Sequence, residues 1–211
     1  MNRSQIIGAV GAAAVIASLF VSSLAFAATP VTAPGQNKIL CFDGTTDGGF
    51  GGTCTLKANG AKGPATLNNT DTNPSGDYSG VYIQNSTLNG QTLGSVTQLG
   101  YSYTGTVTPN PGDLSLNVPV DTNGDSNTDA YLFIDAFYCP GTGGVVDVIH
   151  DSNCGIFVNG VEYSNWAALV AANPTWTVAT DALAFVIAER TPTEPSALWT
   201  VSNITLGKGG K

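Results

Sequence analysis

The stretch Leu114-Ser-Leu-Asn-Val-Pro-Val120 indicates which kind of fold this chain adopts. Its apolar side chains recur at every second residue, as one face of a pleated strand requires. Pro119 cannot donate a hydrogen bond to a neighbouring strand, so we expect it at a sheet edge or at the end of a strand. The stretch therefore predicts a β-strand with one face against a core.

Similar short apolar or alternating runs lie on both sides of this stretch, separated by clusters of Gly, Asn, Asp and Pro. They cover residues 38–42, 53–57, 79–83, 96–103, 131–137, 145–149, 155–163, 175–178, 183–188 and 198–206. Strands at this spacing are typical of a β-sandwich or jelly roll. The sequence has no convincing internal repeat and no second region of different composition. We therefore predict an all-β fold with one domain over residues 37–207.

Two local patterns refine this prediction. Asn159-Gly160 sits between two short apolar runs and favours a hairpin with a type I′ turn, because both residues tolerate positive φ angles. Residues 164–173 begin with a capping Ser164 and place Trp166 and Leu169 at helical spacing. We expect one short helix there, covering an end or a face of the sandwich.

The N-terminus has the order of a secretory signal. Arg3 precedes an apolar region at 6–26, which ends in the A-x-A site Ala25-Phe-Ala27. An uncleaved membrane anchor is the alternative, since the apolar region is nearly long enough to span a bilayer. We predict a signal peptide over 1–27, a linker over 28–36, a flexible tail over 208–211, and a mature chain that is secreted and not membrane-bound.

The four cysteines are expected to pair outside the cytoplasm. Cys41 with Cys54 and Cys139 with Cys154 are the sequence-near pairs among three possible connectivities. A zinc site is the alternative reading, but the chain has no C-x-x-C spacing and only one His.

The composition is acidic, with 15 Asp and Glu against 7 Lys and Arg and a formal net charge of -8. Removing Arg3 with the signal peptide would make the charge still more negative. Such a chain would be repelled by nucleic acid and by anionic membranes, so neither is expected as a partner.

The loop at 121–129 places oxygen-bearing side chains at every second position between two predicted strands. Calcium takes six to eight oxygen ligands, and a tight loop of carboxylates and amides can supply them. The loop resembles the calcium loops of dockerins and thrombospondin type 3 repeats. That resemblance implies side-chain ligands at Asp121, Asn123 and Asp125 and a later ligand at Asp129. It also implies that Asn127 binds through its backbone carbonyl.

The resemblance stops at the twelfth position, where those loops have a carboxylate and this chain has Leu132. Asp135 is the candidate for a closing ligand. The alternative is a solvated loop in which Asp, Asn and Gly serve only the backbone conformation. The acidic loops at 43–47 and 71–77 are weaker candidates for a metal site.

The chain carries few groups that suit catalysis. His150 is the only histidine, and no G-x-S-x-G motif accompanies it. A glycoside hydrolase would need two facing carboxyls, and Glu162 or Glu189 could face Asp135 or Asp147 if the strands brought them together. Glu194 is the third glutamate. We expect a protein without catalytic activity.

Exposed aromatic side chains beside Asn, Asp or Thr would suit a glycan. The aromatic residues available for such a site are Trp166, Trp176, Trp199, Tyr78, Tyr82, Tyr101 and Tyr103, although most large rings belong in a core. The mature region loosely resembles secreted lectin-like or laminin-G-like β-sandwiches. This resemblance implies a secreted module that binds an extracellular glycan or surface polymer. The alternatives are a structural or surface-assembly protein and a secreted glycoside hydrolase.

Overall fold

A computed structural model of the chain describes residues 38–45, 50–57, 64–70, 76–84, 88–139, 141, 143–191 and 194–208. The predicted signal peptide at 1–27, the linker at 28–36 and positions 209–211 of the predicted tail lie outside the described residues. The same is true of parts of the acidic loops at 43–47 and 71–77.

The described residues form strands, one α-helix and one 3₁₀ turn. In chain order these are β1 (Lys38–Asp43), β2 (Thr53–Leu56), β3 (Ala65–Asn69), β4 (Asp77–Gln84), η1 (Leu93–Ser95), β5 (Gln98–Gly105), β6 (Leu114–Asp121), β7 (Ala130–Asp135), β8 (Val145–Asp147), β9 (Ile156–Val158), β10 (Val161–Tyr163), α2 (Trp166–Ala172), β11 (Thr177–Val178), β12 (Ala184–Arg190) and β13 (Ala197–Gly207). The prediction of an all-β sandwich with one short helix is confirmed.

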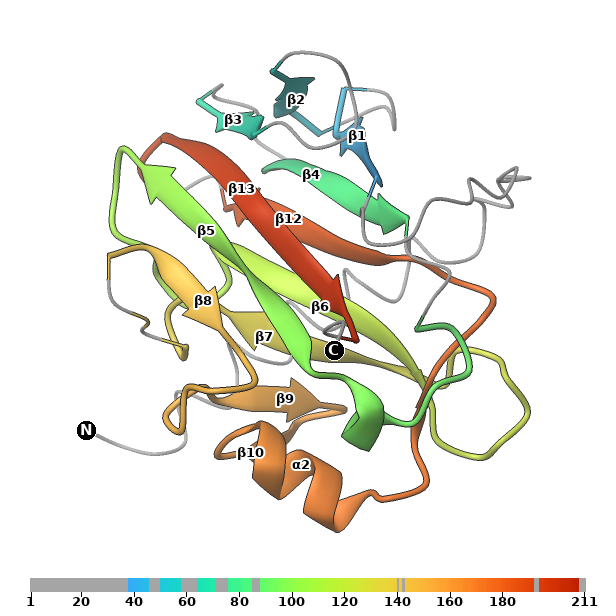
Figure 1. The fold of residues 1–211 in the computed structure, drawn as a ribbon. Coiled ribbons are helices and arrows are strands. Elements are labelled where there is room, and N and C mark those ends of the chain that lie inside the picture. Colours follow the sequence, from blue (N-terminus) through green and yellow to red (C-terminus); the bar gives the residue numbers. More distant parts are fainter. Residues whose placement is uncertain are drawn as a thin grey trace.

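The strands pair antiparallel in two sheets. The larger, eight-stranded sheet has the order β1-β4-β12-β6-β7-β9-β10, and β11 also pairs with β6. The smaller, five-stranded sheet has the order β2-β3-β13-β5-β8. Figure 1 shows β13 and β5 lying across β12, β6 and β7, so the two sheets form the layers of the sandwich.

The core fills the space between the sheets. Strand β12 alternates between buried and half-buried residues along its whole length, with Ala184, Val186 and Ala188 facing the core. On the smaller sheet, the fully buried ring of Trp199 lies against its cross-strand partner Gly105, where a Cβ would be only 2.1 Å from the ring. Glycine at 105 therefore makes room for the largest ring of the core.

Strand β6 lies in the interior of the larger sheet, and both of its faces are buried. It pairs with β12 over Leu114 to Asn117 and with β11 at Val120 and Asp121. Pro119 falls where β6 changes from one of these partners to the other, near the end of the strand. Proline is tolerated there because neither β12 nor β11 pairs with residue 119, so no strand needs the N–H group that proline lacks.

The local predictions of the hairpin and the helix are confirmed, with one correction. Asn159 and Gly160 have φ angles of 48° and 80° and connect β9 to β10. Helix α2 is capped by Asn165, not by the predicted Ser164, because the Asn165 side chain accepts a hydrogen bond from the N–H of Ala168 at 2.9 Å. In the described part of the chain, no helix is long and apolar enough to cross a membrane.

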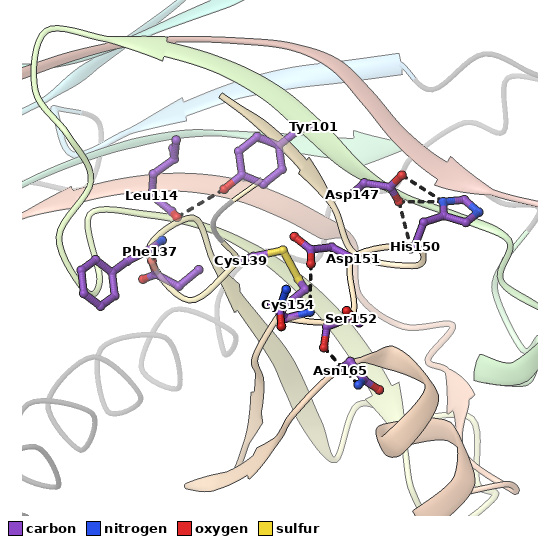
Figure 2. The surroundings of a disulfide bond; sticks show 12 residues. Tyr101, Leu114, Phe137, Cys139, Asp147, His150, Asp151, Ser152, Cys154 and Asn165 are labelled. Atoms are coloured by element: carbon purple, nitrogen blue, oxygen red, sulfur yellow. Dashed lines mark hydrogen bonds and ion pairs between the residues drawn. A yellow bond between two sulfur atoms is a disulfide. The ribbon is translucent and has the colours of Figure 1, made fainter. Parts of the chain in front are cut away.

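Both predicted disulfides are present. Cys41–Cys54 connects β1 of the larger sheet to β2 of the smaller sheet, with Cα atoms 5.5 Å apart. Cys139–Cys154 connects the turn after β7 to the segment before β9, as Figure 2 shows. Each bond closes a loop of about 15 residues, which stabilises the fold by about 3 kcal/mol in the chain-entropy model.

Candidate functional site

The loop at 121–129 is held by hydrogen bonds between its own side chains and backbone. Oδ1 of Asp121 accepts from the N–H groups of Asn123 and Gly124 at 3.0 and 2.7 Å, and Oδ2 accepts from Ser126 at 2.9 Å. Burial raises the pKa of Asp121, but these backbone hydrogen bonds outweigh it, and the pKa lies below its usual value. Asp121 is therefore ionised in the folded protein.

The other predicted calcium ligands bond within the same loop. Asp129 accepts from the backbone N–H of Thr122 at 2.8 Å and from Nδ2 of Asn123 at 3.0 Å. Asp125 accepts from the N–H of Asn127 at 2.9 Å. Among the described residues, no group of three or more His, Cys, Asp or Glu is placed to hold a metal ion. A calcium site in this loop stays a prediction.

Asp135 is out of reach as a closing ligand for that loop. Strands β6 and β7 are antiparallel, so Val120 pairs with Ala130 beside the loop while Asp135 pairs with Ser115 at the far end. Five residues of strand correspond to about 17 Å. The carboxylate of Asp135 instead accepts from the N–H groups of Gly112 and Phe137, at 2.6 and 2.7 Å.

His150 forms an exposed ion pair with Asp147 and not a catalytic triad. Nδ1 of His150 lies 2.9 Å from both carboxylate oxygens of Asp147, and the two side chains are 71% and 50% exposed. Figure 2 shows this pair beside the Cys139–Cys154 disulfide, with Ser152 bonded to Asn165 through its backbone carbonyl. Nothing in the described contacts links His150 to a hydroxyl nucleophile.

Two of the candidate glutamate and aspartate pairs lie on different sheets. Asp147 is on β8 of the smaller sheet, whereas Glu162 is on β10 and Glu189 is on β12 of the larger sheet. Asp135, on β7, is in the same sheet as both glutamates.

Most of the aromatic rings named from the sequence belong to the core. Trp199, Trp166 and Tyr101 are at most 6% exposed, and Trp176 and Tyr103 pack against the same core. Trp199, Trp166 and Tyr101 therefore offer no surface to a ligand, whereas Trp176 and Tyr103 are half-buried.

The outward face of the larger sheet carries a different group of rings, most of which the sequence did not single out. They alternate with core residues along their strands and are half-buried: Phe42 on β1, Tyr82 on β4, Phe185 on β12 and Tyr131 on β7. We call these four residues the aromatic patch. Only Tyr82 was among the aromatic residues considered from sequence alone.

The rings of the aromatic patch contact one another, both between neighbouring strands and across one intervening strand. The Phe42 and Tyr82 centroids are 4.4 Å apart, those of Tyr82 and Phe185 are 6.1 Å apart, and those of Phe185 and Tyr131 are 5.6 Å apart. Gly80, the cross-strand partner of Phe42, has no side chain, and a Cβ there would be 2.3 Å from the Phe42 ring. The missing side chain makes room for the end of that ring above Gly80 of β4.

Phe185 and Tyr131 meet over β6, which lies between their strands. The β6 residues beneath them are Asn117, which pairs with Phe185, and Pro119, which pairs with Tyr131. Asn117 is only 2% exposed and donates to Oγ of Ser115 at 2.9 Å. The aromatic patch therefore covers a polar part of the central strand and presents its own rings outward.

Buried carboxyls lie at one end of this face. Burial raises the pKa of Glu189 and of Asp135 to about 7 each, and the pKa of Asp113 to about 6. Mutual repulsion adds to the shift, since Asp135 raises the pKa of Glu189 and Asp113 raises that of Asp135. These carboxyls are therefore partly protonated near neutral pH, and the face carries less charge than its composition indicates.

The comparisons with known proteins identify no relative. No family model matches the chain, and no curated protein or solved structure matches it either.

Proposed function

We propose that this chain is a secreted, non-catalytic binding module that attaches to an extracellular glycan or surface polymer through the aromatic patch. The observation that carries the proposal is the group of four half-buried rings in mutual contact on the outward face of the larger sheet. Contiguous apolar patches on a protein surface often mark the site where a partner binds.

Sugar rings suit this surface chemically. One face of a pyranose presents C–H groups, which pack against aromatic rings, while its hydroxyls need hydrogen-bonding partners. Burial, with Asp181 and Tyr82 nearby, raises the pKa of Tyr131 to about 12. The phenol of Tyr131 therefore stays protonated and can donate to a sugar hydroxyl.

The cysteines and the predicted signal peptide support an extracellular compartment. Two disulfides indicate an oxidising environment. Secretion beyond that is part of the proposal, and sequencing the N-terminus of protein recovered from the culture medium tests it. A mature chain that begins at Ala28 is expected.

A glycan array with the mature protein, with and without calcium, tests the binding function. We expect binding to a set of glycans, and we expect Phe185→Ala to weaken it. Leu198→Ala is the matched control, because Leu198 is 37% exposed on the smaller sheet and lies outside the aromatic patch. An array with no bound glycan, repeated on intact surface polymers with the same result, would overturn the proposal.

A secreted glycoside hydrolase is the second candidate. It is favoured by Glu189 and Asp135, which lie on the same face of the larger sheet and share raised pKa values. Incubation with each glycan that binds, followed by product analysis, separates the two functions. Turnover that Glu189→Gln abolishes would make the chain an enzyme, whereas binding without products supports the module.

A further inference from the structure

We infer that the outward face of the smaller sheet binds ice, through a row of threonines that crosses four of its strands. This site goes beyond the proposed function, because it lies on the other sheet from the aromatic patch and takes an ordered lattice of water as its ligand.

The row contains one threonine from each of four neighbouring strands. The sheet order is β2-β3-β13-β5, and the strand register places side by side Thr55, Thr66, Thr200 and Thr104. Thr66 and Thr200 each lie between two buried residues of their strands, so their side chains point outward. Cross-strand partners share a face of the sheet, so Thr55 and Thr104 point the same way.

The sheet face around this row carries no charge. Besides the four threonines, its outward residues from β2 to β5 are Thr53, Asn68, Leu198, Ser202 and Ser102. Lys57 follows β2 and Asp147 lies on β8, so these two charges are at the margins. A chain with a net charge of -8 therefore has an extended face without carboxylates. Ice has no place for an ion in its lattice, so a surface that meets ice needs uncharged groups.

The spacing of the threonines is close to a repeat of the ice lattice. Neighbouring strands are about 4.8 Å apart. Water molecules in ice are hydrogen-bonded tetrahedrally at about 2.75 Å, so two oxygens that share a neighbour lie about 4.5 Å apart. Sheet twist rotates the strands about an axis that crosses them, and a row along that axis stays straight. Successive threonines of the row therefore meet successive oxygens of the lattice.

Threonine suits this ligand chemically. Its hydroxyl both donates and accepts, as a water molecule does. Branching at Cβ leaves χ1 few rotamers, so little side-chain entropy is lost when the lattice fixes the hydroxyl. The hydroxyl oxygen of Thr66 is buried and has no hydrogen-bond partner among the described residues. Rotation about χ1 brings this hydroxyl to the surface of the row, where the lattice supplies the missing partner.

Other occupants fit this face less well. The face measures about 14 Å in each direction, whereas a stable protein interface buries about 800 Å² on each partner. A second copy of the chain would therefore find too small a contact here. A sugar would find no aromatic ring to stack on among the outward residues of these strands.

Partitioning of the mature protein into slowly growing ice tests the inference. An advancing ice front excludes proteins that do not bind it, so we expect the wild type in the ice fraction and a non-binding protein of similar size in the liquid. Single ice crystals grown in the wild-type solution are expected to develop facets. Wild-type protein that stays in the liquid overturns the inference.

Substitutions in the row locate the site. Thr200→Lys places a long, charged side chain in the middle of the row and is expected to abolish capture by ice. Thr108→Lys makes the same change at an exposed position after β5, outside the face, and is the matched control. Thr104→Lys, at an exposed position on β5, repeats the test if melting curves show that the Thr200 variant is unfolded. Equal capture of the row variants and the control overturns the inference.

The outcomes keep this site apart from the aromatic patch. Phe185→Ala is expected to weaken glycan binding and to leave capture by ice unchanged, whereas Thr200→Lys is expected to do the opposite. Loss of capture in the Phe185 variant would overturn the assignment to this face. A dimer in light scattering that Thr200→Lys dissociates would assign the face to a second copy and overturn the inference as well.

Discussion

Arg190 holds the carboxylate of Asp77 inside the sandwich, with Nε and Nη2 donating to Oδ2 at 3.1 and 2.7 Å. The two side chains are 6% and 0% exposed, and they join β12 to β4 at their last paired position. Arg190 also donates from Nη1 to the backbone carbonyl of Glu194 at 3.0 Å. The pair therefore ties the end of β12, next to Glu189, to a neighbouring strand and to the following turn.

Removal of one member of this pair should destabilise the fold strongly. Arg190→Met leaves the Asp77 carboxylate in a buried site without its guanidinium, and such a loss costs about 3 to 5 kcal/mol. Urea unfolding measures it, and the double variant with Asp77→Asn should recover part of the loss. His150→Ala breaks an exposed pair and should change the free energy of unfolding by less than about 1 kcal/mol. Equal effects of the two single variants would contradict this prediction.

Stability should fall as the pH rises from about 4 to about 7. Burial raises the pKa of Glu189 and Asp135 to about 7 and of Asp113 to about 6. The folded protein therefore binds more protons than the unfolded chain in this window, so its free energy of unfolding decreases with pH and levels off above it.

Glu189→Gln should remove part of that pH dependence. Glutamine does not ionise, so the variant should be more stable than the wild type at pH 8, by an amount on the order of 1 kcal/mol or more. Urea unfolding at pH 5 and pH 8 checks this. Glu162→Gln, at an exposed position on β10, is the control. A pH profile identical in Glu189→Gln and the wild type would disprove the assignment.

Chelation tests the calcium prediction for the loop at 121–129. With free calcium at about 100 times its dissociation constant, binding adds about 2.7 kcal/mol, and its removal should lower Tm by about 5 to 11 °C. Asp125→Asn should reduce the response. Thermal melts in calcium and in excess chelator measure the difference. An unchanged melting curve would mean that the hydrogen bonds of Asp121 and Asp129 stabilise the loop without a cation.

Gly105→Ala should destabilise the core. Its Cβ would lie 2.1 Å from the buried ring of Trp199, and overpacking of a core costs about 1 to 3 kcal/mol. Gly155→Ala is the control, because a Cβ there has its nearest neighbours at an ordinary 3.5 Å. Thermal unfolding of both variants compares them. Equal melting temperatures for the two would show that the Trp199 ring moves aside freely.

Local signals in the sequence predicted those parts of the fold that depend on neighbouring residues. Alternation identified β6, positive-φ residues identified the β9–β10 turn, and cysteine spacing identified both disulfides. Strand β3 was missed because Ala65–Asn69 has little apolar alternation. Its buried Asn69 bonds to residues on other strands: its side chain donates to the carbonyl of Ala188 and accepts from the hydroxyl of Ser79.

The aromatic patch could not be predicted because its members come from four segments that are distant along the chain. Phe42 and Phe185 are separated by most of the domain, and their contact at 5.9 Å depends on β4 pairing with both β1 and β12. Strand order and register are set by the whole core. The sequence contained these rings but not their adjacency.

The Cys41–Cys54 bond has a mechanical consequence for the domain. The described chain enters the fold through β1, an edge strand that is hydrogen-bonded to β4 along one side. A pull on the N-terminal side of Lys38 would peel such a strand away one hydrogen bond at a time. Because Cys41 is covalently joined to β2 of the opposite sheet, peeling stops at the fourth residue of β1. Tension then passes to both sheets together, so the disulfide protects the domain from unfolding by a pull at this end.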